Sequence, residues 1–301
     1  MKAASNQALP PLGQYANLTL DYREAEASIW YAMHAQPRPC FTPALLAEIA
    51  AFQHRVEALI RAGTLSVSYL VLHSRVPGVF NLGGDLNLFR QHIEAGDRAG
   101  LVAYAKACID VLYANAVHLH LPVTTISLVQ GSALGGGFEA ALSSSVLIAE
   151  KGSEMGLPEI LFNLFPGMGA YSLLSRKLDA HRAEALITAG RLFSAEELFE
   201  MGVVDVLAEP GEGEAAVEKY IRLHRRAANG RRAITRVREY LNPLTYEELI
   251  DIAEIWVDAA LNLTPRDLRL MGKLVGAQNR LKATPAPAAC NGLSRRSLAV
   301  V

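Results

Sequence analysis

Strands that alternate with helical segments predict an α/β fold with parallel strands for this chain of 301 residues. Two runs rich in β-branched and aromatic residues, SVSYLVLH at 66–73 and VTTISLV at 123–129, are typical of buried strands. A glycine-rich turn and then apolar residues at helical spacing follow each run. Hydrophobic residues make up 51% of the chain and charged residues 20%, which is enough apolar material for a large core.

The first elements follow from local pattern. Alternating residues at 15–33 predict a pair of strands joined by a charged turn at 23–26. Thr42 and Pro43 are typical of a helix start, and Gly63 is a plausible stop for that helix.

After the strand at 66–73, a glycine turn leads into a helical region at roughly 86–118. Strands are expected at 123–129, 145–149 and 203–207, and the other segments are expected to be mostly helical.

Four segments describe the expected organisation of the chain: an N-terminal segment 1–14, a core 15–210, a C-terminal helical region 211–282, and a tail 283–301. The tail is rich in small residues and carries prolines, so we expect it to be disordered.

Charge and cysteine content exclude several classes of protein. The 29 basic and 30 acidic residues give a net charge of -1, which argues against a nucleic-acid binder. Cys40, Cys108 and Cys290 lie far apart, which argues against a disulfide framework or a zinc ribbon. No secretory signal is visible, and polar residues interrupt the longest uncharged stretch, 111–138, so we expect a cytoplasmic protein without membrane insertion.

The first candidate site is the run GSALGGGFE at 131–139, where three glycines follow a strand and open a helix. Glycine lets the backbone approach a ligand closely, and unpaired N–H groups at a helix start favour negative charge. The run therefore suits an oxyanion hole, although a tight turn for helix–strand packing explains the glycines equally well. A second glycine turn, NLGGDL at 81–86, offers another backbone donor or is an ordinary loop capped by Asp85.

Two glutamates stand in apolar surroundings, where an isolated carboxylate is costly. Glu139 follows the three glycines, and Glu159 follows Pro158 in MGLPEILFNLFPGMG. Two such carboxyls can have separated pKa values and divide acid and base roles. The alternative is that both are ordinary residues at helix N-termini.

A basic segment occupies residues 219–238, which contain no acidic residue. It could bind an acidic protein partner, a phosphate group or nucleic acid, or it could be a solvated helix face.

NLGGDL, QGSALGGGFEAAL and MGLPEILFNLFPGMGAYSLL, in this order and spacing, resemble the crotonase (enoyl-CoA hydratase/isomerase) superfamily. RPCFTPALL at 38–46, VFNLGGDLNLF at 79–89 and PEILFNLFPGMGAYSLL at 158–174 are most similar to bacterial diffusible signal factor synthases.

The resemblance implies a spiral of ββα turns with a C-terminal helical region that forms a homotrimer. It also implies an oxyanion hole at Gly84 and Gly136, catalytic glutamates at Glu139 and Glu159, and no metal or other cofactor. The NLGG loop departs from the alanine-glycine-alanine-aspartate pattern of many relatives, which leaves Gly84 less firmly assigned than Gly136.

The implied activity is dehydration of a 3-hydroxyacyl-[acyl carrier protein] to a cis-2-enoyl thioester, followed by hydrolysis that releases a cis-2-unsaturated fatty acid as a quorum-sensing signal. Two alternatives are an enoyl-CoA hydratase or isomerase of fatty-acid metabolism, and a binding protein that regulates a sensor kinase through its receiver domain. Acyl length and branching, double-bond geometry, the carrier, the separate roles of the glutamates and the oligomer size stay open.

Two groups of residues are candidates for substrate binding. An acyl chain needs an apolar pocket, and the residues after Glu159 either line it or belong to the core: Leu161, Phe162, Leu164, Phe165 and Met168. Acyl carrier protein is acidic, so the docking candidates are Arg225, Arg226, Arg231 and Arg232.

Overall fold

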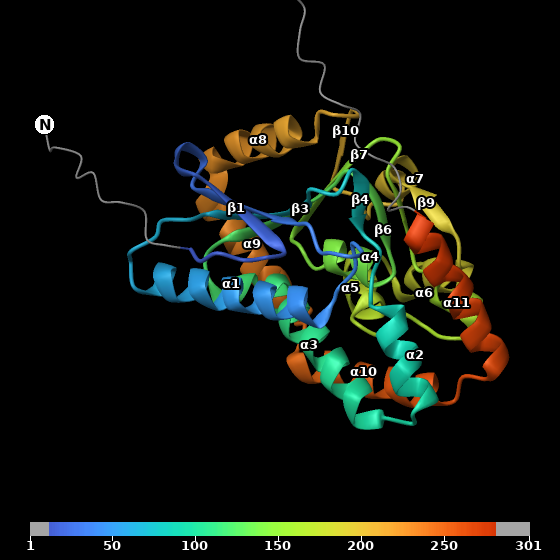
Figure 1. The fold of residues 1–301 in the computed structure, drawn as a ribbon. Coiled ribbons are helices and arrows are strands. Elements are labelled where there is room, and N and C mark those ends of the chain that lie inside the picture. The colour runs from blue at the N-terminus through green and yellow to red at the C-terminus, as the bar shows by residue number, and fades with distance from the viewer. Residues whose placement is uncertain (1–11, 281–301) are drawn as a thin grey trace, which may run out of the picture.

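Residues 12–280 of the computed structural model contain two β-sheets wrapped by helices (Figure 1). The predicted tail 283–301 and most of the predicted segment 1–14 lie outside these residues. The larger sheet has the order β1-β2-β3-β5-β7-β10. Its strands are β1 (Leu18–Arg23), β2 (Ser28–Met33), β3 (Tyr69–Ser74), β5 (Thr124–Val129), β7 (Val146–Glu150) and β10 (Val206–Ala208).

All pairs in the larger sheet are parallel except β1–β2, which forms a hairpin around the short 3₁₀ helix η1 (Glu24–Glu26). This hairpin confirms the predicted strand pair. Side chains alternate between two covered faces: Ile29 and Tyr31 lie in the main core, whereas Trp30 packs in a smaller cluster with Val217 and Ile221. Both faces are thus shielded from water, as expected for strands without polar alternation.

The smaller sheet has the order β4-β6-β8-β9 and was not predicted. Its strands are short: β4 (Gly78–Asn81), β6 (Gly131–Leu134), β8 (Glu154–Gly156) and β9 (Leu192–Ser194). The run at 131–139, predicted as a turn that opens a helix, therefore contains strand β6 before helix α4. A strand of three or four residues carries too few side chains for a periodic pattern.

Successive strands alternate between the two sheets. β3 and β4 precede helices α2 and α3, β5 and β6 precede α4, and β7 and β8 precede η3 and α5. In each unit the first strand joins the larger sheet and the second joins the smaller one. This order is the spiral of ββα turns that the sequence resemblance implies.

Helix α1 begins at the predicted residue, with the Thr42 side chain accepting from the backbone N–H of Leu45 and Pro43 in the first turn. The helical region expected at 86–118 is two helices, because the chain turns at Gly96 and Asp97 caps the second.

The helices are α1 (Pro43–Arg61), α2 (Leu86–Glu94), α3 (Arg98–Ala116), α4 (Gly136–Leu142), α5 (Ala170–Lys177), α6 (Ala180–Ala189), α7 (Ala195–Glu200), α8 (Gly213–His224), α9 (Ala228–Leu241), α10 (Tyr246–Leu261) and α11 (Pro265–Arg280). The remaining 3₁₀ turns are η2 (His118–His120), η3 (Pro158–Phe162) and η4 (Arg225–Ala227).

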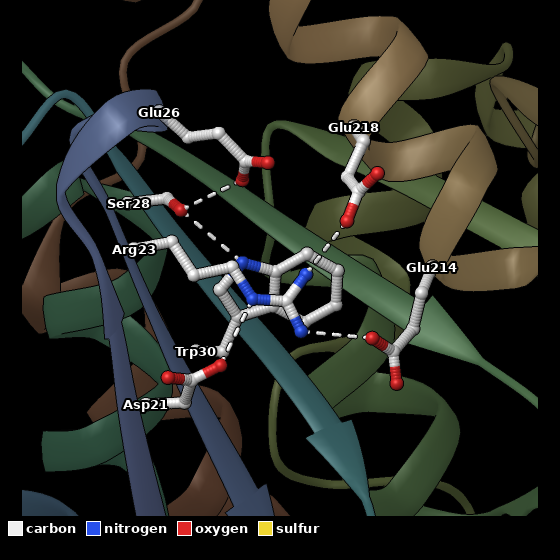
Figure 2. Close-up of polar contacts among 7 residues, drawn as sticks. All are labelled: Asp21, Arg23, Glu26, Ser28, Trp30, Glu214 and Glu218. Carbon is white, nitrogen blue, oxygen red and sulfur yellow. Dashed lines mark hydrogen bonds and ion pairs between the residues drawn. The ribbon is translucent and has the colours of Figure 1, made fainter.

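Helix α8 covers one face of the larger sheet, opposite α1 (Figure 1). Arg23 fixes this helix to the hairpin (Figure 2): it forms ion pairs with Glu214 and Glu218 of α8 at 2.8 and 3.0 Å, and its guanidinium lies 3.9 Å from the centroid of a Trp30 ring. The predicted boundary at 210/211 falls between β10 and α8.

Helix α10 packs against α3 at the lower edge of Figure 1, and α11, at the right of the figure, packs against α2. The C-terminal helical region therefore shares the core with the preceding residues. Among residues 12–280, no helix is long and apolar enough to cross a membrane.

Candidate active site

A cavity of about 150 Å³ lies among α1, α3, α10 and the two glycine turns. Its lining includes Gly84, Gly136, Glu139 and Glu159, so the structure brings together all four residues predicted to carry chemistry. The rest of the wall is mainly apolar or aromatic, with residues such as Tyr31, Phe41, Leu46, Ile49, Leu72, Phe89, Val111, Leu112 and Trp256.

Glu139 is held rigidly in the first turn of α4, with 1% of the residue exposed. Its Oε1 accepts hydrogen bonds from the backbone N–H groups of Met168 and Ala170, both at 2.9 Å. Burial raises the pKa of Glu139 to about 7, although the two backbone donors lower it. The carboxyl is therefore poised to take or give a proton near neutral pH.

Glu159 enters the cavity from η3 and is held less firmly. Its Oε2 is buried and has no hydrogen-bond partner among the described residues. Burial and then the nearby charge of Glu139 raise the pKa of Glu159 to about 8. A methyl group at Gly135 would overlap Oε1 of Glu159, and Gly135 also has a φ of +52°, so glycine is required there for two reasons.

Two backbone N–H groups face the same space from adjacent turns. A methyl group built on Gly136 would lie 3.4 Å from the backbone nitrogen of Gly84, which shows how closely the turns approach. Within residues 12–280, neither N–H donates a hydrogen bond to another protein atom. Gly136 is the first residue of α4, where a backbone donor has no intrahelical acceptor. Two neighbouring backbone N–H groups without an acceptor are the donors that an oxyanion hole requires.

A strap formed by residues 38–41 fixes the turn that carries Gly84. Phe41 N–H donates to the Gly83 carbonyl and Leu82 N–H to the Pro39 carbonyl, both at 2.8 Å. Arg38 pairs with Asp85 at 2.7 Å, and the Asp85 side chain caps α2.

Tyr104 joins the strap to the turn with one hydroxyl. Its Oη donates to the Phe41 carbonyl and accepts from the Asp85 N–H, the latter at 3.2 Å. The Phe89 ring packs closely against the other side of the turn. A methyl group built on Gly84 would lie only 2.5 Å from Phe89 Cζ. The NLGG turn is therefore held by the strap, by Tyr104 and by Phe89 together.

Of the five residues predicted for an acyl pocket, three lie in the cavity wall and two do not. Phe162, Leu164 and Met168 line the cavity. Leu161 is 54% exposed and Phe165 packs against the core without lining the cavity, so the prediction was wrong for these two. The reversal of direction at Asn163, which has a φ of +62°, prevents a continuous apolar run from facing one side.

Five aromatic residues of the wall were not predicted from the sequence: Tyr31, Phe41, Phe89, Tyr104 and Trp256. Phe89 lies with its ring centroid 5.0 Å from those of Tyr104 and Trp256. Trp256 comes from α10, more than a hundred residues after the glycine turns, and its only signal in the sequence was an apolar helical pattern. Local pattern cannot show which distant helix covers a cavity.

The four arginines proposed for docking lie outside the cavity, on η4 and α9, and all are exposed. Two of them have partners within the chain. Arg225 donates to the Ala25 carbonyl at 2.7 Å, and Arg231 donates to the Tyr220 hydroxyl at 2.9 Å.

Comparisons with known proteins agree with this geometry. Residues 40–258 match the model of the enoyl-CoA hydratase/isomerase family. Mitochondrial methylglutaconyl-CoA hydratases of Homo sapiens and Rattus norvegicus are each 32% identical over 160 residues, or 53% of this chain and 45% and 49% of theirs. The chain thus spans about half the length of the curated relatives it matches.

Solved structures show the same fold at low identity. Pseudomonas aeruginosa DspI has a TM-score of 0.66 and 22% identity, covering 85% of this chain and 98% of its own. An enoyl-CoA hydratase from Bacillus halodurans has a TM-score of 0.72 and 16% identity, covering 86% and 100%. Because the family model spans most of the sequence and the fold agrees, this chain belongs to the crotonase (enoyl-CoA hydratase/isomerase) family.

Proposed function

We propose that this protein is a diffusible signal factor synthase, which dehydrates a 3-hydroxyacyl-[acyl carrier protein] and hydrolyses the resulting cis-2-enoyl thioester to a free fatty acid. The observation that carries the proposal is that two buried carboxyls with raised pKa values share one apolar cavity with two free backbone N–H groups. The similarity of segments 38–46, 79–89 and 158–174 to such synthases supports the subgroup, and the fold shared with DspI is consistent with it.

In the dehydration step, the thioester oxygen lies between the N–H groups of Gly84 and Gly136. The Glu139 carboxylate takes the proton from C2, and its two backbone donors favour the ionised form that a base requires. Glu159, with the higher pKa, gives its proton to the departing 3-hydroxyl. The C2–H and C3–O bonds break, a C2–C3 double bond forms and water leaves.

The hydrolysis step starts from the protonation states that dehydration leaves. Glu159 is now a carboxylate and takes a proton from water, whose oxygen attacks the thioester carbonyl. The tetrahedral oxyanion occupies the same pair of N–H donors. When it collapses, Glu139 protonates the leaving thiolate, so both glutamates return to their starting states. This route needs no serine or cysteine nucleophile.

Hydration or isomerisation of enoyl-CoA is the second candidate, because the matched family and the matched mitochondrial relatives carry those names. It uses the same four groups and differs in the carrier and in the absence of hydrolysis. The products therefore discriminate between the two functions.

We also propose that the carrier protein docks on the arginines of η4 and α9 and that the protein forms a trimer through its C-terminal helices. Helix α9 buries none of its residues, and its exposed apolar side chains are Ile234, Val237, Tyr240 and Leu241. Such a face is typical of a surface that associates with another chain. Sedimentation equilibrium of the purified protein tests the trimer.

Mass spectrometry of the products tests the activity. Purified protein is incubated with 3-hydroxydodecanoyl-[acyl carrier protein], beside the variants Glu139→Gln and Glu159→Gln. We expect free cis-2-dodecenoic acid from the native protein and a loss of about 10²- to 10⁴-fold in each variant. Glu154→Gln, which changes an exposed glutamate on β8 outside the cavity, is the matched control and should keep full activity.

Turnover of enoyl-CoA without release of free acid would instead support the hydratase. Equal product from the native protein and both variants would contradict any role for the two carboxyls.

A further inference from the structure

A second hollow lies on the outer side of the active-site cavity, between α1 and α3. It has a volume of about 120 Å³ and is lined by residues of α1, α3 and η2, including Ala50, His54, Tyr113, Ala114 and His120. Among the described residues, Gln53 is the only one that lines both hollows. Its side chain therefore forms the wall between them.

Gln53 interrupts the apolar row of α1. Leu46, Ile49 and Gln53 are spaced three and four residues apart, so they share a helix face, and all three line the active-site cavity. Gln53 is only 4% exposed, and burial of a primary amide is costly unless it is hydrogen-bonded. Its Nε2 donates to the Val111 carbonyl of α3 at 2.9 Å, which fixes the side chain across the gap between the helices.

Gln53 lies well along α1 from the end of this helix that adjoins the Gly84 turn. The start of α1 follows Phe41, which is hydrogen-bonded to the Gly84 turn, and Gln53 lies about 15 Å further along the helix. Tyr31, Leu72 and Val111 make the neighbouring wall apolar. The cavity thus runs from carboxyls and backbone donors at one end to hydrocarbon at the other, and a fixed amide closes the hydrocarbon end.

We propose that Gln53 sets the maximum length of the acyl chain. This inference rests on the proposed function, because it takes the cavity to hold an acyl thioester. The terminal methyl group of the longest accepted chain abuts the Gln53 side chain. A longer chain would have to displace the Gln53 side chain, whose bulk fills the gap between α1 and α3.

Removing the wall should join the two hollows. In Gln53→Ala the terminal methylenes can enter the space beside Ala114 and Tyr113, and the preferred chain should lengthen by about two to four carbons. Each added pair of buried methylenes should improve affinity about tenfold. Gln53→Met has a side chain of similar length, so it keeps the wall and should keep the native length preference. His54→Ala, which changes only the outer hollow, is the matched control on the same helix.

The test is calorimetric binding of S-alkyl pantetheine thioethers with chains of about eight to sixteen carbons, which the enzyme cannot cleave. The native protein, Gln53→Met and His54→Ala should share one length optimum, and Gln53→Ala should prefer longer chains. Adding Ala114→Leu to Gln53→Ala refills the outer hollow and should restore the native optimum. An unchanged optimum in folded Gln53→Ala, or a longer optimum in Gln53→Met, would overturn the role of Gln53.

Absence of binding by every thioether to the native protein would overturn the acyl-pocket assignment itself, and hence the proposed function. Binding with a length optimum that Gln53→Ala does not move would leave the proposed function intact and reject only this inference. The two failures are therefore distinguishable.

Discussion

The active-site cavity buries its ionisable side chains, whereas helix α9 exposes its charged side chains to water. Glu139 is 1% exposed and Glu159 has a buried oxygen without a hydrogen-bond partner, while the arginines of α9 and η4 are exposed. Buried carboxyls disfavour their own ionised form, so they reduce stability at the pH where they perform acid–base chemistry. Exposed arginines cost little free energy of folding, and they act only on a charged partner that approaches them. Changes in the cavity should therefore alter turnover of any substrate, and changes on α9 should alter only carrier-linked substrates.

Among variants that keep both carboxyls, the largest effect is expected from Gly84→Ala. A methyl group there would lie 2.5 Å from Phe89 Cζ, so the turn must shift and the N–H donor must move away from the thioester oxygen. Loss of one such donor typically lowers kcat by about 10²- to 10³-fold. Steady-state kinetics on carrier-linked and small thioesters should show the same loss for both.

Gly230→Ala is the matched control for this substitution, since nothing lies within 4 Å of a methyl group at that position of α9. A kcat for Gly84→Ala within twofold of the native value would contradict an oxyanion role for this turn.

A residue of this site could be predicted from the sequence where its signal lies in the neighbouring residues. Glu139 and Glu159 were singled out because each stands in an apolar run, whereas Gly136 was chosen among its three glycines through the family resemblance. Trp256 was missed because its place in the wall depends on α10 packing against α3. Strands β4, β6, β8 and β9 were missed because they are three or four residues long and are stabilised by pairing with distant partners. The spiral itself was predicted through resemblance, since hydrophobic periodicity gives the α/β class and not the order of strands.

The two carboxyls should also make stability depend on pH. Burial raises both pKa values above the ordinary value near 4.5, to about 7 for Glu139 and about 8 for Glu159. A carboxyl raised in this way favours the folded state while it is protonated, so its contribution is complete below about pH 4.5 and is lost as the pH rises through the folded-state pKa. The free energy of unfolding should therefore fall between about pH 5 and pH 8.

Glu159→Gln removes one of these titrations. Between about pH 5 and pH 9, denaturant titrations should show Glu159→Gln gaining on the order of 4 kcal/mol relative to the native protein. Glu154→Gln, which makes the same substitution at an exposed position outside the cavity, is the matched control. Parallel curves for the native protein and Glu159→Gln would show that this carboxyl has an ordinary pKa in the folded protein.

A smaller effect is expected from Tyr104→Phe, which keeps the ring in the cavity wall and removes the hydroxyl that links Phe41 to Asp85. The carbonyl of Phe41 and the N–H of Asp85 each lose a partner, and the Gly84 turn gains freedom. We expect kcat to fall about tenfold, with a smaller change in KM, because the N–H donor must be fixed when the oxyanion forms.

Tyr113→Phe changes a tyrosine on the same helix whose ring meets Tyr246 and His120 instead of the glycine turn, and it should leave kcat unchanged. An equal loss of kcat in both variants would point to a general effect on α3 and not to the strap.

The smallest effect should come from α9 and should be confined to one substrate. Arg226 and Arg232 are better targets than Arg225 and Arg231, because the latter pair is bonded within the chain. In the double variant Arg226→Glu, Arg232→Glu we expect KM for an acylated carrier protein to rise roughly fivefold, with KM for a small acyl thioester unchanged. Raising the salt concentration should shrink the difference, since exposed charges are screened.

The same change of charge at Arg61 and Arg182, which are exposed on α1 and α6, serves as the control. Sedimentation of each variant shows whether the assembly is preserved, because α9 also carries the apolar side chains proposed for the trimer. A rise in KM that is equal for both substrates, or equal in the control, would place carrier recognition elsewhere and leave α9 with self-association alone.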